Sequence, residues 1–446
     1  MKKNHFVGII FCLYPFHIYA ETSHNIEERL SLLEQRVTDA ENKEADKTTQ
    51  SVKPMQATDT TADKKSLLTK ELQLTGLTDI KFYGDVEFNM DTASRTGSLT
   101  SVRTSLNKEW APGEKERWDI NGRILLGFDG SYTGNNGHFS GFSVQPLADM
   151  TGDVNLDDAV FYFGQKDDWK IKVGRFEAYD MFPLNQDTFV EYSGNTANDL
   201  YSDGYGYIYM MKEGRGRSSD GGNFLLSKQI DNWYFELNTL VEDGSSLFVD
   251  SSYHGRTLDN QKNVIYTRPV ISWKYGNYNF AVGMEKNLVR NAYGSTNNSG
   301  TWVDQSQRTG YGLTMNWDTL KQDPDNGMTI NFSTAYMDAV SEKDFSVGVN
   351  GLWRNIELGY IYAHNNIEQF DSSAISDSCD SNCALLSPGR YDIHTIHTSW
   401  KIPDIMDMPN FNIYLGAYVS WLNSKSEASD SSQDRYGARL RFKYLF

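Results

Sequence analysis

Aromatic and acidic side chains gather in one long segment whose chemistry suits sugar binding. The segment runs from Ala178 to about Gly222 and begins AYDMFPLNQDTFVEYSGNTANDLYSDGYGY. Aromatic faces offer an apolar surface to the C–H side of a pyranose ring, and carboxylates accept hydrogen bonds from its hydroxyls. The candidate residues in this segment are Tyr179, Asp180, Phe182, Asp187, Phe189, Glu191 and Tyr192.

Side chains from other parts of the chain could form a wall opposite this segment. Arg123, Arg439, Arg441 and Tyr83 all lie in stretches where apolar and polar residues alternate. Alternate residues of a strand project from the same face of the sheet. Guanidinium and phenol groups both hydrogen-bond to hydroxyls, so these four side chains are further candidates for lining a pore.

The final stretch, RYGARLRFKYLF, shows this alternation most clearly. One face is apolar and aromatic, and the other carries Arg435, Gly437, Arg439, Arg441 and Lys443. This pattern predicts a strand with one apolar and one polar side. We interpret it as the closing strand of an outer-membrane β-barrel, with its aromatic face in lipid and its basic face in the pore.

The start of the chain predicts export from the cytoplasm. Lys2 and Lys3 precede an apolar run that ends near Tyr19, and we expect cleavage after Ala20. The domain organisation that we predict is a signal peptide at 1–20, a periplasmic coiled-coil helix at 21–41, a polar linker at 42–75 and a β-barrel at 76–446.

The predicted coiled coil rests on a short heptad pattern. Its apolar positions recur with spacings of about three and four residues, at Ile26, Leu30, Leu33, Val37 and Ala40. Two successive segments have the pattern Arg-h-x-x-h-Glu, where h is apolar, which resembles that of short trimeric coiled coils. The pattern therefore predicts a homotrimer, although a charged, solvated helix is the alternative.

Composition and alternation together favour a transmembrane barrel. The chain has 26 Tyr, 23 Phe and 10 Trp, yet no stretch after the signal has the length of an apolar membrane-spanning helix. Alternating segments such as DIKFYGDVEFNM and RWDINGRILLGF recur from Asp79 to the end. We predict an all-β fold, an antiparallel transmembrane barrel of sixteen strands. A barrel of eighteen is the alternative if GYGYIYMMKEGRGR contains a further strand pair.

The tryptophan positions indicate which ends of the predicted strands lie at the same rim of the barrel. We expect eight of the ten to lie at one rim, beside short turns that include APGEKER and QKDDW, because Trp concentrates where the bilayer meets water. These eight are Trp110, Trp118, Trp169, Trp233, Trp273, Trp317, Trp353 and Trp400. Trp110 is expected to end one strand and Trp118 to begin the next, with two strands in all between Arg117 and Gln165. Both chain ends then lie in the periplasm, and the segment from Ala178 becomes the third outer loop.

That loop is the longest connection in the predicted barrel, and such long connections are usually functional. It either covers the mouth of the pore or folds into the lumen as a constriction, and we expect the second. Selectivity would then come from pore width, lining groups and the local field.

The chain resembles a known family at this point. A signal peptide, a short coiled coil, a polar tether and a barrel ending in Phe are similar to the sucrose porin, and the segments FYGDVEFNMD and VGRFEAYDMFPLNQD resemble the raffinose glycoporins. The resemblance implies a trimeric outer-membrane channel of Gram-negative cells for passive diffusion of oligosaccharides such as raffinose and sucrose. It also implies that the barrel-assembly machinery reads the terminal Phe446. A general diffusion porin for small solutes and ions is the alternative.

The sequence argues against several other functions. The histidines of the mature chain are scattered and lie in no nucleophile motif, so we expect no enzyme and no cofactor. Cys379 and Cys383 are predicted to form a small disulfide loop. We expect no metal site there, because His394 and His397 fall on opposite strand faces. The net charge of −17 disfavours nucleic acid as a partner.

Overall fold

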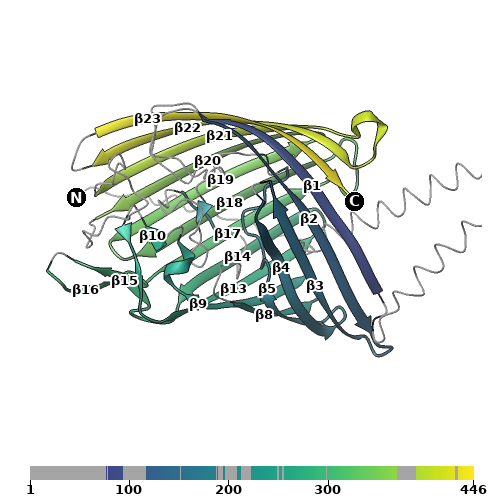
Figure 1. Cartoon of the computed structure of the whole chain (residues 1–446), viewed down its shortest axis with the longest axis horizontal. Helices are drawn as coiled ribbons and strands as arrows, with labels where there is room; N and C mark the ends of the chain where they lie inside the picture. The colour runs from purple at the N-terminus through teal and green to yellow at the C-terminus, as the bar shows by residue number, and fades with distance from the viewer. Residues whose placement is uncertain are drawn as a thin grey trace, which may run out of the picture.

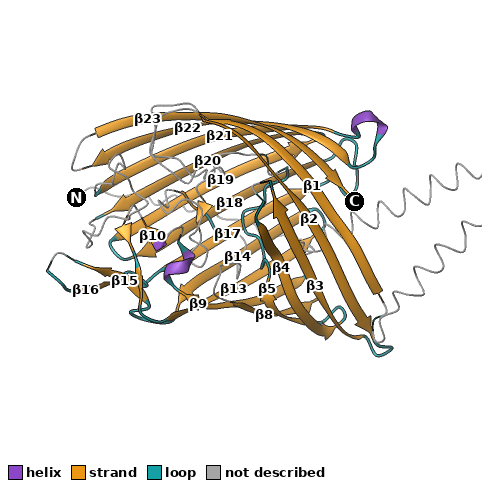
Figure 2. Ribbon diagram, in the orientation of Figure 1, coloured by secondary structure: helices purple, strands orange, loops and turns teal. Residues whose placement is uncertain are grey.

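The computed structural model describes residues 77, 79–93, 117–150, 152–186, 188, 194–195, 208–211, 222–248, 251–253, 256–297, 299–368, 388–426 and 430–446. Within this part of the chain, no helix is long and apolar enough to cross a membrane. The helical pieces that it contains are single 3-10 turns, such as η1 (Ser245–Leu247) and η3 (Ile405–Asp407) (Figure 2).

Sixteen antiparallel strands close into one barrel (Figure 1). Neighbours in the wall follow the order of the chain, and β1 pairs with β23, which leaves no open sheet edge. The strands are β1 (Asp79–Ala93), β2 (Arg117–Thr133), β3 (His138–Asp149), β4 (Val154–Gln165), β5 (Trp169–Arg175), β8 (Gly222–Ile230), β9 (Trp233–Asp243), β13 (Asn263–Tyr275), β14 (Tyr278–Asn287), β17 (Thr309–Asp318), β18 (Met328–Ala339), β19 (Glu342–Trp353), β20 (Ile356–Ile367), β21 (Gly389–Ile402), β22 (Phe411–Ser426) and β23 (Asp430–Leu445).

Short strands that are not part of the barrel wall form three small sheets. β6 (Gly194–Asn195) pairs in parallel with β7 (Ile208–Tyr209), and β10 (Ser252–Tyr253) pairs with β11 (Arg256–Thr257). β12 (Asp259–Asn260), β15 (Tyr293–Thr296) and β16 (Trp302–Asp304) form the third.

The two rims of the barrel differ in the length of their connections. The Gly84 amide donates to the Phe446 carbonyl at 2.9 Å, so the start of β1 and the end of the chain share one rim, here called the C-terminal rim. It lies on the right of Figure 1, whereas β15 and β16 project from the opposite end, here called the loop rim. The longest connection, residues 176–221 between β5 and β8, is the third one at the loop rim.

The strands have an apolar outer face and a largely polar inner face, as their alternation predicts. On β1, the Phe82 side chain is 67% exposed, whereas the inward Asp91 is only 5% exposed. On β2, Trp118 and Ile124 face outward. An outer surface of bare Phe, Ile, Val and Leu suits lipid, because hydrocarbon offers no hydrogen bonds to polar groups.

The count of sixteen strands is confirmed, and the alternative of eighteen is excluded. The segment that could have held an extra strand pair contains β7, which pairs with β6 rather than with the wall. The predicted signal peptide (1–20), coiled coil (21–41) and linker (42–75) lie outside the described residues, as do Cys379 and Cys383.

The predicted strand boundaries were wrong in the first quarter of the barrel. We expected a separate strand to end near Trp110, but β1 pairs directly with β2 through Ala93 and Arg117. We also expected two strands between Arg117 and Gln165, where the structure has β2, β3 and β4. The two errors cancel in the count.

The same error misplaced one tryptophan. Trp118 pairs with Thr92 at the loop rim instead of joining the tryptophans at the C-terminal rim. The turn APGEKER accordingly belongs to the connection between β1 and β2 at the loop rim. Trp110 lies outside the described residues. The strand ends at the C-terminal rim carry the other six, Trp169, Trp233, Trp273, Trp317, Trp353 and Trp400, and they form the aromatic girdle expected at a bilayer surface.

Candidate functional site

One side of the inner wall carries a ladder of ion pairs across β23, β1 and β2. Arg439 makes a bidentate contact with Asp91, with both N–O distances at 2.7 Å. Arg441 lies 3.2 Å from Glu87 and donates to Asn89 at 3.0 Å. Arg439 and Arg441, both predicted to face the pore, therefore project inward, but carboxylates of β1 partly neutralise their charge.

Arg123 and Tyr83 lie on the same side of the barrel. The Arg123 guanidinium is 3.4 Å from Asp85. The Tyr83 phenol donates to Asp129 at 3.1 Å and accepts from Gln145 at 2.8 Å. These contacts fix both side chains on the inner face of β1–β3.

The third loop (residues 176–221) contacts the other side of the inner wall. The Tyr179 amide donates to Glu236 of β9 at 2.9 Å, and Arg268 of β13 donates to the Tyr179 carbonyl at 2.8 Å. The Tyr179 ring stacks on Tyr234, with centroids 5.9 Å apart. Burial raises the pKa of Tyr179 to about 12, and its phenol hydrogen-bonds to Asn279 of β14.

The loop then crosses strand after strand along the wall. Thr314 of β17 donates to the Met181 carbonyl, and Asn350 of β19 donates to the Pro183 carbonyl at 2.9 Å. Further on, the Glu357 carboxylate of β20 accepts from the Asn185 amide at 2.9 Å.

The same carboxylate also holds the next residue of the loop. It accepts from the Gln186 amide at 2.7 Å. The Gln186 side chain in turn accepts from Ser399 of β21 at 2.7 Å. The described part of the loop thus runs along the inside of the barrel, held by hydrogen bonds between loop backbone and inward side chains.

The returning limb of the loop uses the same wall. The Tyr209 phenol donates to Glu285 of β14 at 2.7 Å, and Ser346 of β19 donates to the Tyr209 carbonyl. Glu285 lies 3.6 Å from Arg268, and both side chains are fully buried. This buried ion pair therefore holds both limbs, because Arg268 binds the outgoing limb at Tyr179 and Glu285 binds the returning one.

Glycines in the wall make room for these loop side chains. A Cβ built on Gly348 would overlap the Phe182 ring, one on Gly312 would overlap Met211, and one on Gly310 would overlap the Tyr209 phenol. Gly283 and Gly416 lie under other loop atoms in the same way. These five inward positions, here called the glycine bed, let the loop lie close to the sheet.

The sequence-predicted loop residues fall into two groups. Tyr179 and Phe182 are each 4% exposed and pack against the wall, so as placed they anchor the loop and do not present ring faces to a solute. Asp180 is half-buried and accepts from the Phe182 amide at 2.7 Å. The other candidates, Asp187, Phe189, Glu191 and Tyr192, lie outside the described residues.

Sequence reasoning missed the anchors on the wall. Glu236, Arg268, Glu285 and Glu357 hold the loop, and strand alternation does place each of them on the inward face. The available signal was a run of inward charged residues opposite apolar outward ones, together with inward glycines on β14, β17 and β19. The alternation does not reveal which loop residue each of these wall residues contacts, because each contact joins residues far apart in sequence.

Comparison with known proteins agrees with this architecture. Residues 82–446 match the model of the family described as "Porin-like glycoporin RafY". The chain belongs to this family. The match spans nearly the whole barrel and confirms the family resemblance predicted from the sequence. No curated protein sequence gives a significant match.

Solved structures share the fold at low sequence identity. The high-pH structure of Pseudomonas putida OprB has a TM-score of 0.51 and 10% identity, covering 86% of the glycoporin and 96% of its own chain. The anion-selective porin from Comamonas acidovorans has a TM-score of 0.48 and 12% identity, covering 82% and 99%. The outer membrane channel DcaP of Acinetobacter baumannii has a TM-score of 0.48 and 11% identity, covering 83% and 100%. The likeness to OprB supports the fold alone.

The family and the closed barrel together establish the general activity. The chain forms an outer-membrane β-barrel that acts as a passive channel rather than as an enzyme.

Proposed function

We propose that the glycoporin conducts oligosaccharides, such as sugars of the raffinose and sucrose type, past a constriction formed by the third loop. The observation that carries this proposal is the attachment of the loop to the inner wall from β9 to β21. A loop held there by Glu236, Arg268 and Glu357 narrows the lumen on that side. The ion-pair ladder of Arg439, Arg441 and their acidic partners forms the opposing side.

The residues that meet the sugar are proposed to be those between the two anchored limbs. Phe189 and Tyr192 supply ring faces, and Asp187 and Glu191 accept hydrogen bonds from hydroxyls. Tyr179 and Phe182 act differently, as supports that hold this part of the loop in place. The sugar therefore meets aromatic and acidic groups on one side of the pore, and arginines on the other.

Single-channel current in a planar bilayer tests this proposal. Increasing sucrose, raffinose or maltotriose should block the current in a concentration-dependent way. Phe189→Ala with Tyr192→Ala should weaken the block, because ring stacking contributes on the order of 1 kcal/mol per ring beyond area burial. Asp187→Asn with Glu191→Gln should chiefly reduce the preference for cations.

A general diffusion pore is the second candidate function. The burial of the Tyr179 and Phe182 rings favours it, because two of the predicted stacking surfaces are turned to the wall. Absence of block by all three sugars in the parent channel would decide for this alternative. Unchanged block in the Phe189 and Tyr192 variant would show that the channel binds sugar, but that these two rings are not the binding site.

Assembly as a homotrimer is part of the same proposal. Its support is the pair of Arg-h-x-x-h-Glu segments near the N-terminus. Recognition of Phe446 by the barrel-assembly machinery likewise stays a prediction. Chemical cross-linking of the purified channel should give a trimer that persists when residues 21–45 are deleted, because so short a coil buries little area and contacts between barrels would supply most of the interface.

A further inference from the structure

Two buried carboxyls and an amide meet on the inner wall near the loop rim. Glu342 and Asp344 occupy alternate positions at the start of β19, so both point inward, and they are 4% and 1% exposed. Asn365 of β20 pairs with Asp344 in the sheet register and is also 1% exposed. Its amide nitrogen donates to Asp344 Oδ1 at 2.6 Å. These three side chains are here called the β19–β20 cluster.

The cluster holds more hydrogen-bond acceptors than donors. Glu342 lies within hydrogen-bonding reach of Asp344, but an ionised carboxylate only accepts hydrogen bonds. Within the part of the chain that the structure describes, Asp344 Oδ2 and Asn365 Oδ1 are buried and have no hydrogen-bond partner. Buried oxygens in this situation cost free energy, and in native proteins such groups usually meet a water or an ion.

The charged groups along the inner wall offset the negative charge of the cluster only in part. Arg308, just before β17, attracts Asp344. The next arginine along the wall, Arg268, lies 3.6 Å from Glu285 and binds the third loop. The surroundings therefore lower the attraction of the cluster for a cation but do not abolish it.

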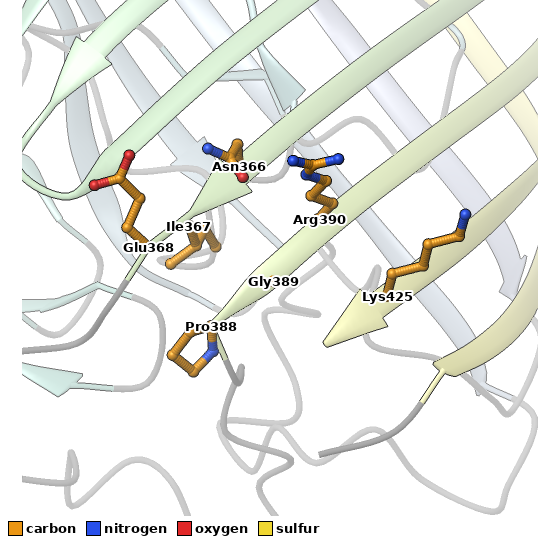
Figure 3. Close-up of a pocket in the computed structure, with 7 residues that line it drawn as sticks. All are labelled: Asn366, Ile367, Glu368, Pro388, Gly389, Arg390 and Lys425. Atoms are coloured by element: carbon orange, nitrogen blue, oxygen red, sulfur yellow. The ribbon is translucent and has the colours of Figure 1, made fainter. Parts of the chain in front are cut away.

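Other cations of these strands lie on the opposite face of the wall. Lys343, between the two carboxyls in sequence, is exposed on the outside. Figure 3 shows Arg390 and Lys425 beside Asn366, at the surface groove between β20, β21 and β22. Asn366 follows Asn365 in the chain and therefore points away from the cluster. The sheet thus separates these three cations from the buried carboxyls.

A cation would satisfy the cluster more completely than a proton or a water molecule. A proton shared by Glu342 and Asp344 would leave Asn365 Oδ1 without a partner. A water molecule could donate to both unsatisfied oxygens, but it would leave two like charges in contact. Within the described residues, no three His, Cys, Asp or Glu side chains form a metal site, so the amide oxygen is needed as the third ligand.

We propose that the β19–β20 cluster binds Ca²⁺ through a carboxylate oxygen of Glu342, Asp344 Oδ2 and Asn365 Oδ1. Carboxylate and amide oxygens are the ligands that Ca²⁺ prefers, and water completes its coordination. Mg²⁺ fits less well, because it gives up its own water shell reluctantly and this site is almost fully buried. With three protein ligands and Arg308 nearby, we expect a Kd on the order of 10⁻⁴–10⁻³ M, as in extracellular modules.

Bound Ca²⁺ would join β19 to β20 beside an anchor of the third loop. Ser346, two residues after Asp344 on the same face, donates to the Tyr209 carbonyl of the returning limb. The charge of Asp344 also acts on the Tyr209 phenol. The ion would therefore stiffen the wall where this limb is attached. The proposal does not depend on which solute passes the pore.

Calorimetric titration of Ca²⁺ into the channel, refolded in nonionic detergent without lipid, tests the proposal. We expect one saturable site per chain. Asp344→Asn should weaken binding at least about tenfold, because loss of even an outer partner of a metal ligand costs about 10–100-fold. The matched control is Asp338→Asn, which removes an exposed outward carboxylate from the neighbouring β18 and should bind as the parent does. Absence of saturable binding by the parent, or equal affinity in the two variants, would overturn the proposal.

Asn365→Asp provides a measurement that a folding defect cannot imitate. It replaces the amide oxygen by a carboxylate, so the affinity for Ca²⁺ should rise, because the affinity of such sites increases with ligand charge. Unchanged or weaker binding would exclude Asn365 as a ligand and overturn the proposal. Mg²⁺ should bind more weakly than Ca²⁺ to the parent. Equal affinity for the two ions would indicate general attraction to lumen carboxylates and would also overturn the proposal.

Discussion

Replacement of Glu357 by Ala should release the middle of the third loop from the wall. Its carboxylate is 2% exposed and accepts from the Asn185 amide at 2.9 Å, from the Asn185 side chain at 3.2 Å and from the Gln186 amide at 2.7 Å. Alanine removes all three acceptor contacts without adding bulk. The two backbone donors then lose their partner.

The expected size of the effect follows from those two donors. An unpaired buried donor costs about 1–3 kcal/mol. The turn is partly buried and pore water can reach it, so we take the lower limit of about 1 kcal/mol for each donor. A loss of about 2 kcal/mol raises the population of the detached turn roughly 30-fold.

Single-channel recording measures this detachment. We expect more open-channel noise, a larger mean conductance and weaker block by sugar, because the loop spends more time away from its position. Glu87→Ala is the matched control, since it also removes an inward carboxylate but acts on the ion-pair ladder. Identical changes in the two variants would show that lumen charge and not attachment is responsible. An unchanged trace for Glu357→Ala would refute the anchoring role.

Three further changes test other parts of the structure. Gly348→Leu should displace the loop from its glycine bed and enlarge the size limit for solutes in liposome swelling. Gly351→Leu, on the outer face of the same strand, is the control and should leave that limit unchanged. Equal size limits in the two variants would contradict the role of the glycine bed in seating the loop. Arg439→Gln should leave Asp91 without its ion-pair partner and raise cation preference in reversal-potential measurements. Unchanged selectivity would argue against a role for the ladder in the pore field. Phe446→Ser should lower the amount of heat-modifiable barrel in outer membranes, and normal levels would remove the terminal ring from the assembly step.

Strand alternation was sufficient to predict which side of each strand faces lipid. The final strand illustrates this, because Tyr436 and Tyr444 are exposed on the outside while Arg439 and Arg441 make ion pairs inside. A shift of one residue would exchange these faces. The pattern therefore carries strong information wherever one face must be apolar.

Strand boundaries were harder to predict where that pattern breaks. β3 shows a register shift between Val144 and Pro146 in its pairing with β4, which interrupts the alternation near its end. Gly137 in the turn before β3 has φ 81°, a conformation that favours glycine. Recognition of this turn in the sequence would have separated β2 from β3. Without that turn, the strand that begins at Arg117 was predicted to run in the opposite direction, and Trp118 was assigned to the opposite rim.

The path of the third loop could not be predicted from local sequence patterns, for a different reason. Its contacts join residues such as Gln186 and Glu357, which are 171 positions apart. Alternation predicts that Glu357 faces inward, but it does not say whether water, an ion or loop backbone will meet it. Only the closed barrel brings these groups together, because closure fixes which inward faces the loop can reach.

The two faces of the wall around β19 and β20 show how one sheet serves two environments. Inside, Gly348 leaves space for Phe182, and Glu357 binds the loop backbone; outside, Phe345 and Leu358 on the same strands face lipid. Because neighbouring residues point to opposite faces, substitutions that reshape the pore leave the lipid surface unaltered. Pore width in this barrel can therefore change through inward glycines and carboxylates alone, with no cost to membrane insertion.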